Sequence, residues 1–230
     1  MPRLTLALVI ALLLAAPAKA ETVVVGHSTQ GRAIVAKRLG DPEAKKTALI
    51  VGQIHGDEPA GIKITRALRE LTINDVNVWV IDTANPDGNA HHNRHNARGV
   101  DLNRNFAYRW VHTKKGTRYY GGPKALSEPE SRATRKFIIK IRPDVTIWYH
   151  QPWNAVLTPC NSKPRLQRIY AKLAHMKTSC QGAELLGTAT SWENAKVGGH
   201  AFVVELAAGG ISDATAQLNA RAAVAAAAAG

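Results

Sequence analysis

Short apolar runs separated by helical stretches are the feature of this 230-residue sequence that most constrains its fold. The runs at 47–54 and 76–81 are long enough for strands that are buried on both faces. Between them, residues 60–71 carry apolar side chains at helical spacing, and Pro59 is tolerated at the start of a helix. Buried strands that alternate with helices are typical of an α/β fold with a mostly parallel sheet.

The rest of the chain continues this alternation. Ser127-Glu-Pro-Glu130 is a capping-box pattern, which predicts a helix to about Ile141. The length suits one well-packed domain and is short for two. We predict a single domain over 21–230, with a mixed, mostly parallel central β-sheet flanked by helices. Its other expected elements are strands at 22–25, 33–37, 144–149 and 201–204, and helices at 164–176 and from Asp213 onward.

Two segments depart from this alternation. Residues 85–125 are polar and rich in glycine, and they are too long for a plain connection, so we expect a functional loop. The alanine-rich tail from about residue 222 is interpreted as a fraying helix end.

The first twenty residues have the features of a secretory signal peptide. Arg3 gives a short basic start, residues 4–15 are apolar, and Ala18-Lys19-Ala20 fits a cleavage site. The apolar stretch is too short to span a bilayer, although an uncleaved anchor is the alternative. No later segment is long and apolar enough for a membrane span. We therefore expect export to the periplasm, the cell exterior or the cell wall.

The two cysteines, Cys160 and Cys180, agree with export. An oxidising compartment favours a disulfide between them, and free buried thiols are the alternative.

The formal charge of the chain is +13, and it remains +11 without Arg3 and Lys19. Such a charge attracts nucleic acid, acidic lipids or acidic wall polymers. Aromatic residues make up only 6% and no nucleic-acid-binding motif is present, which argues against nucleic acid as a partner. For an exported protein an anionic cell-wall polymer is the more natural partner, and a charge that serves solubility alone is the alternative.

Three of the predicted strands end in a metal-binding or proton-transferring side chain: His55, His150 and Glu205. Ligands of open α/β sheets bind beyond the carboxyl ends of the strands, so these side chains can converge on one crevice. His55 and Glu58 have the H-x-x-E spacing, which can place an imidazole and a carboxylate beside one metal. A histidine from a distant strand would complete three protein ligands and leave a position for water, as in catalytic zinc sites.

Each of these signals is weak alone. H-x-x-E often occurs by chance in a solvated turn, His150 could be a hydrogen-bonded histidine at the core edge, and Glu205 could pair with an arginine. The loop sequences "NPDG" at 85–88 and "RHNARGVDLNRNF" at 94–106 shift the balance toward a functional site.

With these loops the sequence resembles the zinc carboxypeptidases of the carboxypeptidase A type, and within them the short bacterial murein peptide amidases. The matching stretches occur in the order of the family and cover most of the mature chain. They are "HGDEPAG" from His55, "NPDG" from Asn85, "GVDLNRNF" from Gly99, "SEPE" from Ser127, "YHQP" around His150 and "VVELAAG" around Glu205.

The resemblance implies one zinc ion and a general base. His55, Glu58 and His150 fall on the zinc ligands of the family, and Glu205 falls on its general base. This chemistry is sensible on its own terms, because zinc lowers the pKa of a bound water and a nearby carboxylate can take its proton. Asp57 could orient His55, or it could face solvent.

The resemblance also implies substrate-binding residues. Asn103 and Arg104 fall on the pair that holds the substrate's terminal carboxylate, which a guanidinium can meet with two parallel hydrogen bonds. Arg94 falls on the arginine that stabilises the oxyanion, and Arg98 is its rival. The mobile tyrosine that animal carboxypeptidases carry shortly before the general base has no counterpart within 187–200.

A second cluster, His91, His92 and His95, invites a second metal site. We interpret it as a solvated loop, because no carboxylate accompanies it in the immediate segment.

Together these features predict a secreted zinc amidase or carboxypeptidase that acts on peptidoglycan peptides, at the bond between D-glutamate and a diamino acid. A general carboxypeptidase for ordinary peptides is the first alternative. A non-catalytic wall-binding protein and an acyl-amino-acid deacylase are the others; the intact ligand set argues against the former and the loop sequences against the latter.

Overall fold

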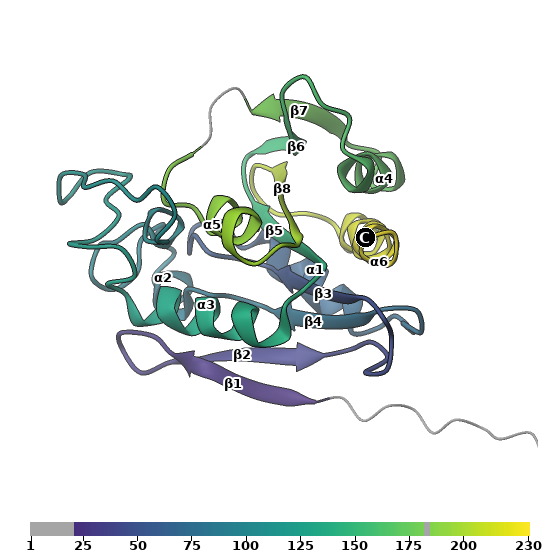
Figure 1. Ribbon diagram of the computed structural model, residues 1–230, viewed down its shortest axis with the longest axis horizontal. Coiled ribbons are helices and arrows are strands. Elements are labelled where there is room, and N and C mark those ends of the chain that lie inside the picture. The colour runs from purple at the N-terminus through teal and green to yellow at the C-terminus, as the bar shows by residue number, and fades with distance from the viewer. Residues whose placement is uncertain (1–20, 182–184) are drawn as a thin grey trace, which may run out of the picture.

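The computed structural model describes residues 21–181 and 185–230, and the predicted signal peptide lies outside them. One mixed sheet forms its centre (Figure 1). The strands are β1 (Thr22–His27), β2 (Ala33–Arg38), β3 (Thr47–Val51), β4 (Asn77–Ile81), β5 (Val145–His150), β6 (Trp153–Pro159), β7 (Lys177–Gln181) and β8 (His200–Ala207). Their order in the sheet is β1-β2-β4-β3-β5-β8-β6-β7.

The centre of this sheet is parallel, as the alternation of strands and helices predicts. β4, β3, β5 and β8 run in the same direction, while β2 and β6 are antiparallel to them. All six residues of β5 and four of the five in β3 are buried, as expected for strands covered on both faces. The predicted α/β fold in a single domain is confirmed.

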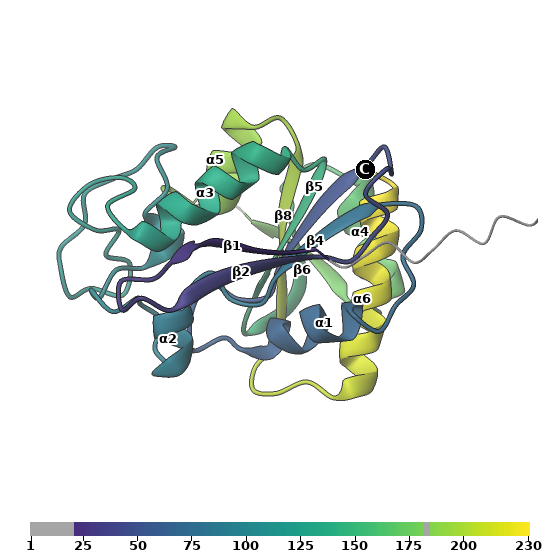
Figure 2. The same cartoon turned by 90° about the horizontal axis from the view of Figure 1, so that it is seen from below.

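Helices cover both faces of the sheet (Figure 2). They are α1 (Ala60–Leu68), α2 (Pro86–Ala90), α3 (Pro129–Ile141), α4 (Arg165–Leu173), α5 (Ala189–Lys196) and α6 (Asp213–Ala228), with a short 3₁₀ helix η1 (Leu102–Arg104). One apolar core lies between the sheet and α1, α4 and α6, and a second lies beneath α3 and α5. None of the helices within the described residues has the length and apolar character needed to cross a bilayer.

Two of the three predicted strand ends are wrong in detail. β3 ends at Val51, so His55 lies in the loop that follows it. Glu205 lies inside β8, because this strand continues to Ala207 in order to pair with Trp153 of β6. His150 is the last residue of its strand, as predicted.

The alanine-rich end of the chain is not frayed, contrary to the prediction. It forms the second half of α6, and the side chains of Ala222, Ala223, Ala226 and Ala227 are at most 1% exposed. α6 packs against α1 and α4. Small side chains permit this close approach between helices, so the tail is a core element.

Other local predictions also need correction. α3 begins after Glu128, and neither Ser127 nor Glu128 caps it through a side chain; instead the Ser127 hydroxyl donates to the Glu128 carboxylate. β6, β7 and α5 are not predicted from the sequence. The disulfide between Cys160 and Cys180 is confirmed, and it joins the segment after β6 to β7.

Candidate metal centre and active site

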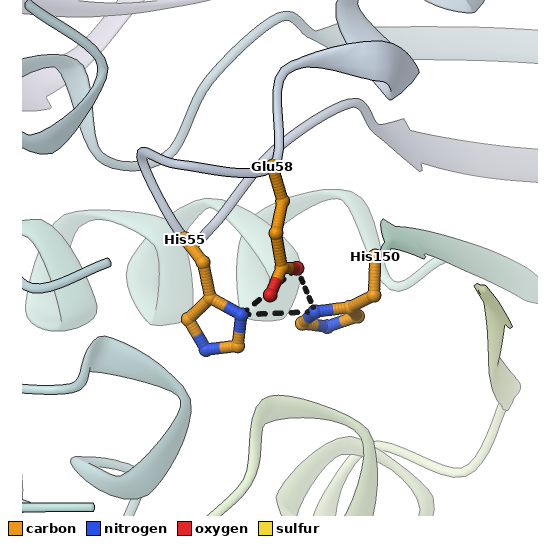
Figure 3. A group of neighbouring side chains, drawn as sticks. All are labelled: His55, Glu58 and His150. Carbon is orange, nitrogen blue, oxygen red and sulfur yellow. Dashed lines mark hydrogen bonds and ion pairs between the residues drawn. The ribbon is translucent and has the colours of Figure 1, made fainter. Parts of the chain in front are cut away.

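Three buried side chains face one another where the chain leaves β3 and β5 (Figure 3). Nδ1 of His55 lies 3.0 Å from Oε2 of Glu58 and 3.1 Å from Nδ1 of His150. Nδ1 of His150 lies 2.9 Å from the same Glu58 oxygen. The ligand atoms of the three residues all lie within 4.8 Å of one another, a set of two imidazoles and one carboxylate that suits a zinc ion.

The turn after β3 places two of these ligands together. The backbone N–H of Glu58 donates to the carbonyl of His55, so both side chains project from one turn just before α1. Gly56 lies between them, and a Cβ atom there would be only 2.0 Å from the backbone of Gly88. Only glycine therefore allows this turn to pack against α2.

Asp101 supports His55 from behind, although it is not among the residues that the sequence predicts. Its Oδ1 lies 3.1 Å from Nε2 of His55, which leaves Nδ1 of that ring to face the cluster. Burial opposes the charge of Asp101, but the hydrogen bond with His55 and the positive charge of Arg94 hold its pKa well below the usual range. Asp57, the predicted candidate for this role, is exposed. The stretch "DLNRNF", which begins with Asp101, is the signal that could have identified it.

Of the two candidate arginines, only Arg94 lies at the cluster. Its Nε and Nη2 donate to Oδ2 of Asp101 at 3.1 and 2.8 Å. Its Nη1 lies 3.3 Å from Oε1 of Glu58 and 3.2 Å from Nδ1 of His55. Arg98 instead points toward Glu128, with an N–O distance of 3.8 Å, and its side chain is 56% exposed.

The predicted carboxylate-binding pair lies in η1, beside the same cluster. Nδ2 of Asn103 is 3.4 Å from Nε2 of His150, and its Oδ1 accepts a hydrogen bond from the backbone N–H of Ala189 in α5. Nη1 of Arg104 donates to the carbonyl of Asn103 at 2.7 Å. Burial lowers the pKa of Arg104. Both residues line a cleft of about 1460 Å³ that also includes the three ligands and Glu205.

Glu205 is buried beside this cluster, on the strand next to His150. The two residues are paired in the parallel register of β5 and β8. Burial, helped by the negative charge of Glu58, raises the pKa of Glu205 to about 7. Its Oε2 is buried and has no hydrogen-bond partner within the described residues. A water held at the metal centre could supply the missing partner, so this orphaned oxygen fits a zinc site.

The histidine-rich loop lies apart from this arrangement. His91 and His92 are exposed, and Nε2 of His95 lies 2.9 Å from the carbonyl oxygen of Arg118. Among the described residues, one group of three histidine, cysteine, aspartate or glutamate side chains is close enough to share a metal: His55, Glu58 and His150.

Known proteins resemble this chain in sequence and in fold. The family model described as zinc carboxypeptidase matches residues 6–225. Murein peptide amidase A of Escherichia coli K12 is 33% identical over 133 residues, which cover 52% of this chain and 55% of that protein. Carboxypeptidase B of Astacus astacus is 25% identical over 224 residues, which cover 82% and 72%. The chain thus aligns with about half the length of the murein peptide amidases.

Solved structures extend the likeness to most of the chain. The murein-tripeptide amidase of Escherichia coli O157 has a TM-score of 0.70 at 26% identity and covers 88% of this chain and 89% of its own. Carboxypeptidase A of Helicoverpa armigera has a TM-score of 0.74 at 20% identity, covering 91% and 69%, and supports the fold alone. With the family match and the His-Glu-His cluster, these findings show that the chain belongs to the zinc carboxypeptidase family, whose members use one zinc ion.

Proposed function

We propose that this protein is a secreted zinc-dependent amidase or carboxypeptidase that hydrolyses an amide bond next to a free carboxylate. Its proposed substrates are peptidoglycan peptides, cut between γ-linked D-glutamate and a diamino acid. One observation carries the proposal: the His-Glu-His cluster, the unpartnered Oε2 of Glu205 and the guanidinium of Arg104 share one cleft.

A division of labour follows from this geometry. A zinc ion held by His55, Glu58 and His150 would polarise the substrate carbonyl and acidify a water. Glu205 takes the proton from the attacking water and delivers it to the nitrogen of the leaving amine. Burial has raised its pKa to about 7, which suits a group that must both accept and release a proton near neutral pH.

The arginines handle the negative charges of substrate and transition state. Nη1 of Arg94 lies within 3.3 Å of two of the proposed ligands, where it can stabilise charge that develops on the carbonyl oxygen. Arg104 is the last residue of η1, lines the same cleft, and can meet a carboxylate with two parallel hydrogen bonds.

Similarity to the murein amidases supports the wall substrate. The Escherichia coli murein-tripeptide amidase structure matches 88% of the chain, and the +11 charge that remains without Arg3 and Lys19 favours work on an anionic wall. The chain has no acidic residue from 145 to 183, where Arg165, Arg168 and Lys172 surround a surface cavity of about 440 Å³. This basic surface supports an anionic wall polymer as an additional partner.

A general carboxypeptidase is the second candidate. The observation in its favour is the match with the Astacus carboxypeptidase B, which spans a larger share of both chains than the murein amidase sequences do. The ligand cluster and Glu205 would serve either enzyme equally, so only the substrate separates them.

The deciding experiment is product analysis by mass spectrometry. Purified zinc-loaded protein is incubated with a γ-D-glutamyl-diaminopimelate peptide and with an ordinary L-dipeptide of similar size. We expect the first to be cleaved and the second to be left nearly intact. Equal or better cleavage of the dipeptide would favour the general carboxypeptidase, and activity that survives complete removal of the metal would refute both.

Glu205→Gln tests the proton transfer itself. The amide keeps the shape of the side chain but cannot accept the proton, so turnover should fall at least ~10²-fold while the zinc content stays near one per chain. Near-normal turnover by zinc-loaded Glu205→Gln protein would assign the general base to another residue.

A further inference from the structure

An exposed tyrosine on the long loop covers both arginines of the site. Tyr119 is 50% exposed and lines the cleft. Cζ of Arg104 lies 5.0 Å from the centroid of the ring, and Cζ of Arg94 lies 5.6 Å from it. Both distances are within the range of about 6 Å over which an aromatic face attracts a cation. One ring thus contacts both guanidiniums: that of Arg94, proposed to stabilise the oxyanion, and that of Arg104, proposed to bind the carboxylate.

Two hydrogen bonds hold the backbone that carries this ring. The carbonyl of Tyr119 accepts a hydrogen bond of 2.9 Å from Oγ1 of Thr113. The next carbonyl, of the buried Tyr120, accepts one of 2.8 Å from the backbone N–H of Asp101. Because Asp101 itself bonds His55, the segment that carries Tyr119 is linked through Asp101 to the candidate metal centre.

The electrostatics of Arg104 explain what such a cover can do. Burial lowers the pKa of Arg104, which means that its charge has lost part of its hydration. Among the described residues, its guanidinium makes one hydrogen bond, from Nη1 to the carbonyl of Asn103. A guanidinium has five N–H donors, so most of them stay free for a ligand. A ring whose centroid lies 5.0 Å from Cζ can exclude water on that side without using any of these donors.

We propose that Tyr119 is a substrate-positioning residue whose ring shields Arg104 from water and strengthens its grip on the substrate carboxylate. The inference rests on the proposed function, because it assumes that Arg104 meets a carboxylate. A guanidinium–carboxylate pair attracts more strongly where water is excluded. The hydroxyl of Tyr119 has no hydrogen-bond partner in the described part of the chain, so the ring, rather than the hydroxyl, carries this role.

Binding to the slow Glu205→Gln protein tests the inference separately from catalysis. Zinc-loaded Glu205→Gln protein is titrated by calorimetry with the γ-D-glutamyl-diaminopimelate peptide and with the same peptide amidated at the carboxylate next to the scissile bond. Adding Tyr119→Ala should weaken binding of the free carboxylate about tenfold, because water then screens its pair with Arg104, and should change binding of the amide less than about twofold. Adding Tyr119→Phe keeps the ring and should leave both affinities within about twofold.

A matched control lies on the same loop. Val111 is also exposed but does not line the cleft, so Val111→Ala should change neither affinity. Four results would overturn the inference: unchanged binding in Tyr119→Ala, equal losses for acid and amide, a loss in Tyr119→Phe as large as in Tyr119→Ala, or no binding of the free carboxylate at all. Failure of the proposed function is a different result, since it appears as an absence of hydrolysis by the protein with Glu205 intact.

Discussion

Buried carboxylates lie at both ends of β5, and their pKa values are shifted in opposite directions. At the carboxyl end, Oε2 of Glu58 lies 2.9 Å from Nδ1 of His150. Burial opposes the charge of Glu58, but its hydrogen bonds with His150 and His55 hold its pKa well below the usual range. At the other end, burial raises the pKa of Glu193 to about 7.

The partners of the two acids explain the difference. Glu193 accepts hydrogen bonds from the hydroxyl of Thr146 and, at 3.4 Å, from Nε1 of Trp148, and both donors are neutral. Thr146, Trp148 and His150 are every second residue of the strand, so all three side chains are on the same face of β5. Burial favours the neutral form of both acids, and the hydrogen bonds of the carboxylate outweigh burial only at Glu58. Glu58, at the end of the strand that forms the candidate metal centre, therefore stays ionised.

Replacing the acid that lacks a charged partner should have the largest effect on stability. The unfolded carboxyl titrates near 4.5 and the folded one near 7, so the folded protein binds this proton more tightly. Its contribution to stability is therefore full below about pH 4.5, is lost as the pH rises, and levels off above about pH 7. The rise in the pKa of Glu193 corresponds to about 3 kcal/mol of unfolding free energy. Glu193→Gln should therefore be more stable than wild type by up to about 3 kcal/mol at pH 8.

Urea unfolding of both proteins between pH 5 and 8 measures this difference. The gain should shrink steadily toward pH 5, because the wild-type carboxyl is then protonated and resembles the amide. A stability difference that does not depend on pH would contradict the assignment of a raised pKa to Glu193.

The charged end of the strand should respond through metal affinity instead. Asp101→Asn keeps the size of the side chain but removes the charge behind His55 and weakens the orientation of that ring. Loss of such a partner typically lowers metal affinity about 10- to 100-fold. Competition between the protein and a zinc-binding dye measures it.

Asp57→Asn is the matched control for this measurement. Asp57 is closer to His55 in sequence than Asp101 is, but it is exposed. Its zinc affinity should stay within about twofold of wild type, as expected for a surface change. Equal losses in the two variants would show that the support of His55 does not pass through Asp101.

The smallest effect is expected for the donor to Glu193. Thr146→Val removes a hydrogen bond to a buried carboxyl and should lower the free energy of unfolding by about 1 kcal/mol at pH 5. The loss should grow above pH 7, where the carboxylate is charged and depends more on its donor. Unfolding curves at the two pH values test this.

Thr134→Val gives the comparison for that substitution. Oγ1 of Thr134 is buried in α3 and has no hydrogen-bond partner among the described residues. Its replacement should therefore cost less than Thr146→Val at both pH values. The opposite ranking would show that the Thr146 hydroxyl does little for Glu193.

Local patterns in the sequence predicted much of the framework. The apolar runs of β3, β4 and β5 predict buried strands, because a central parallel strand is covered on both faces and its sequence is therefore almost continuously apolar. His55 and Glu58 are predictable as a pair because one turn of chain connects them. His150 follows from its place at the end of a recognisable strand.

Elements at the margins of the sheet carry weaker signals. The apolar run of β6 is short and lies between exposed residues, and β7 is an exposed edge strand with lysine, threonine and serine. Their pairing is determined by the neighbouring strand and by the disulfide rather than by an apolar alternation. The same holds for the alanines of α6, whose composition is compatible with a frayed end or with a tight helix interface.

Only the tertiary structure decided which neighbours each polar group contacts. Asp101 reaches His55 from 46 residues away, Tyr119 comes to lie over Arg94 and Arg104, and Glu193 is left with neutral donors. The sequence by itself determined which chemical groups are present and which strands are buried. Charge state, ring orientation and solvent exclusion depend on atoms within a few ångströms, and folding brings those atoms together from segments whose local patterns do not refer to one another.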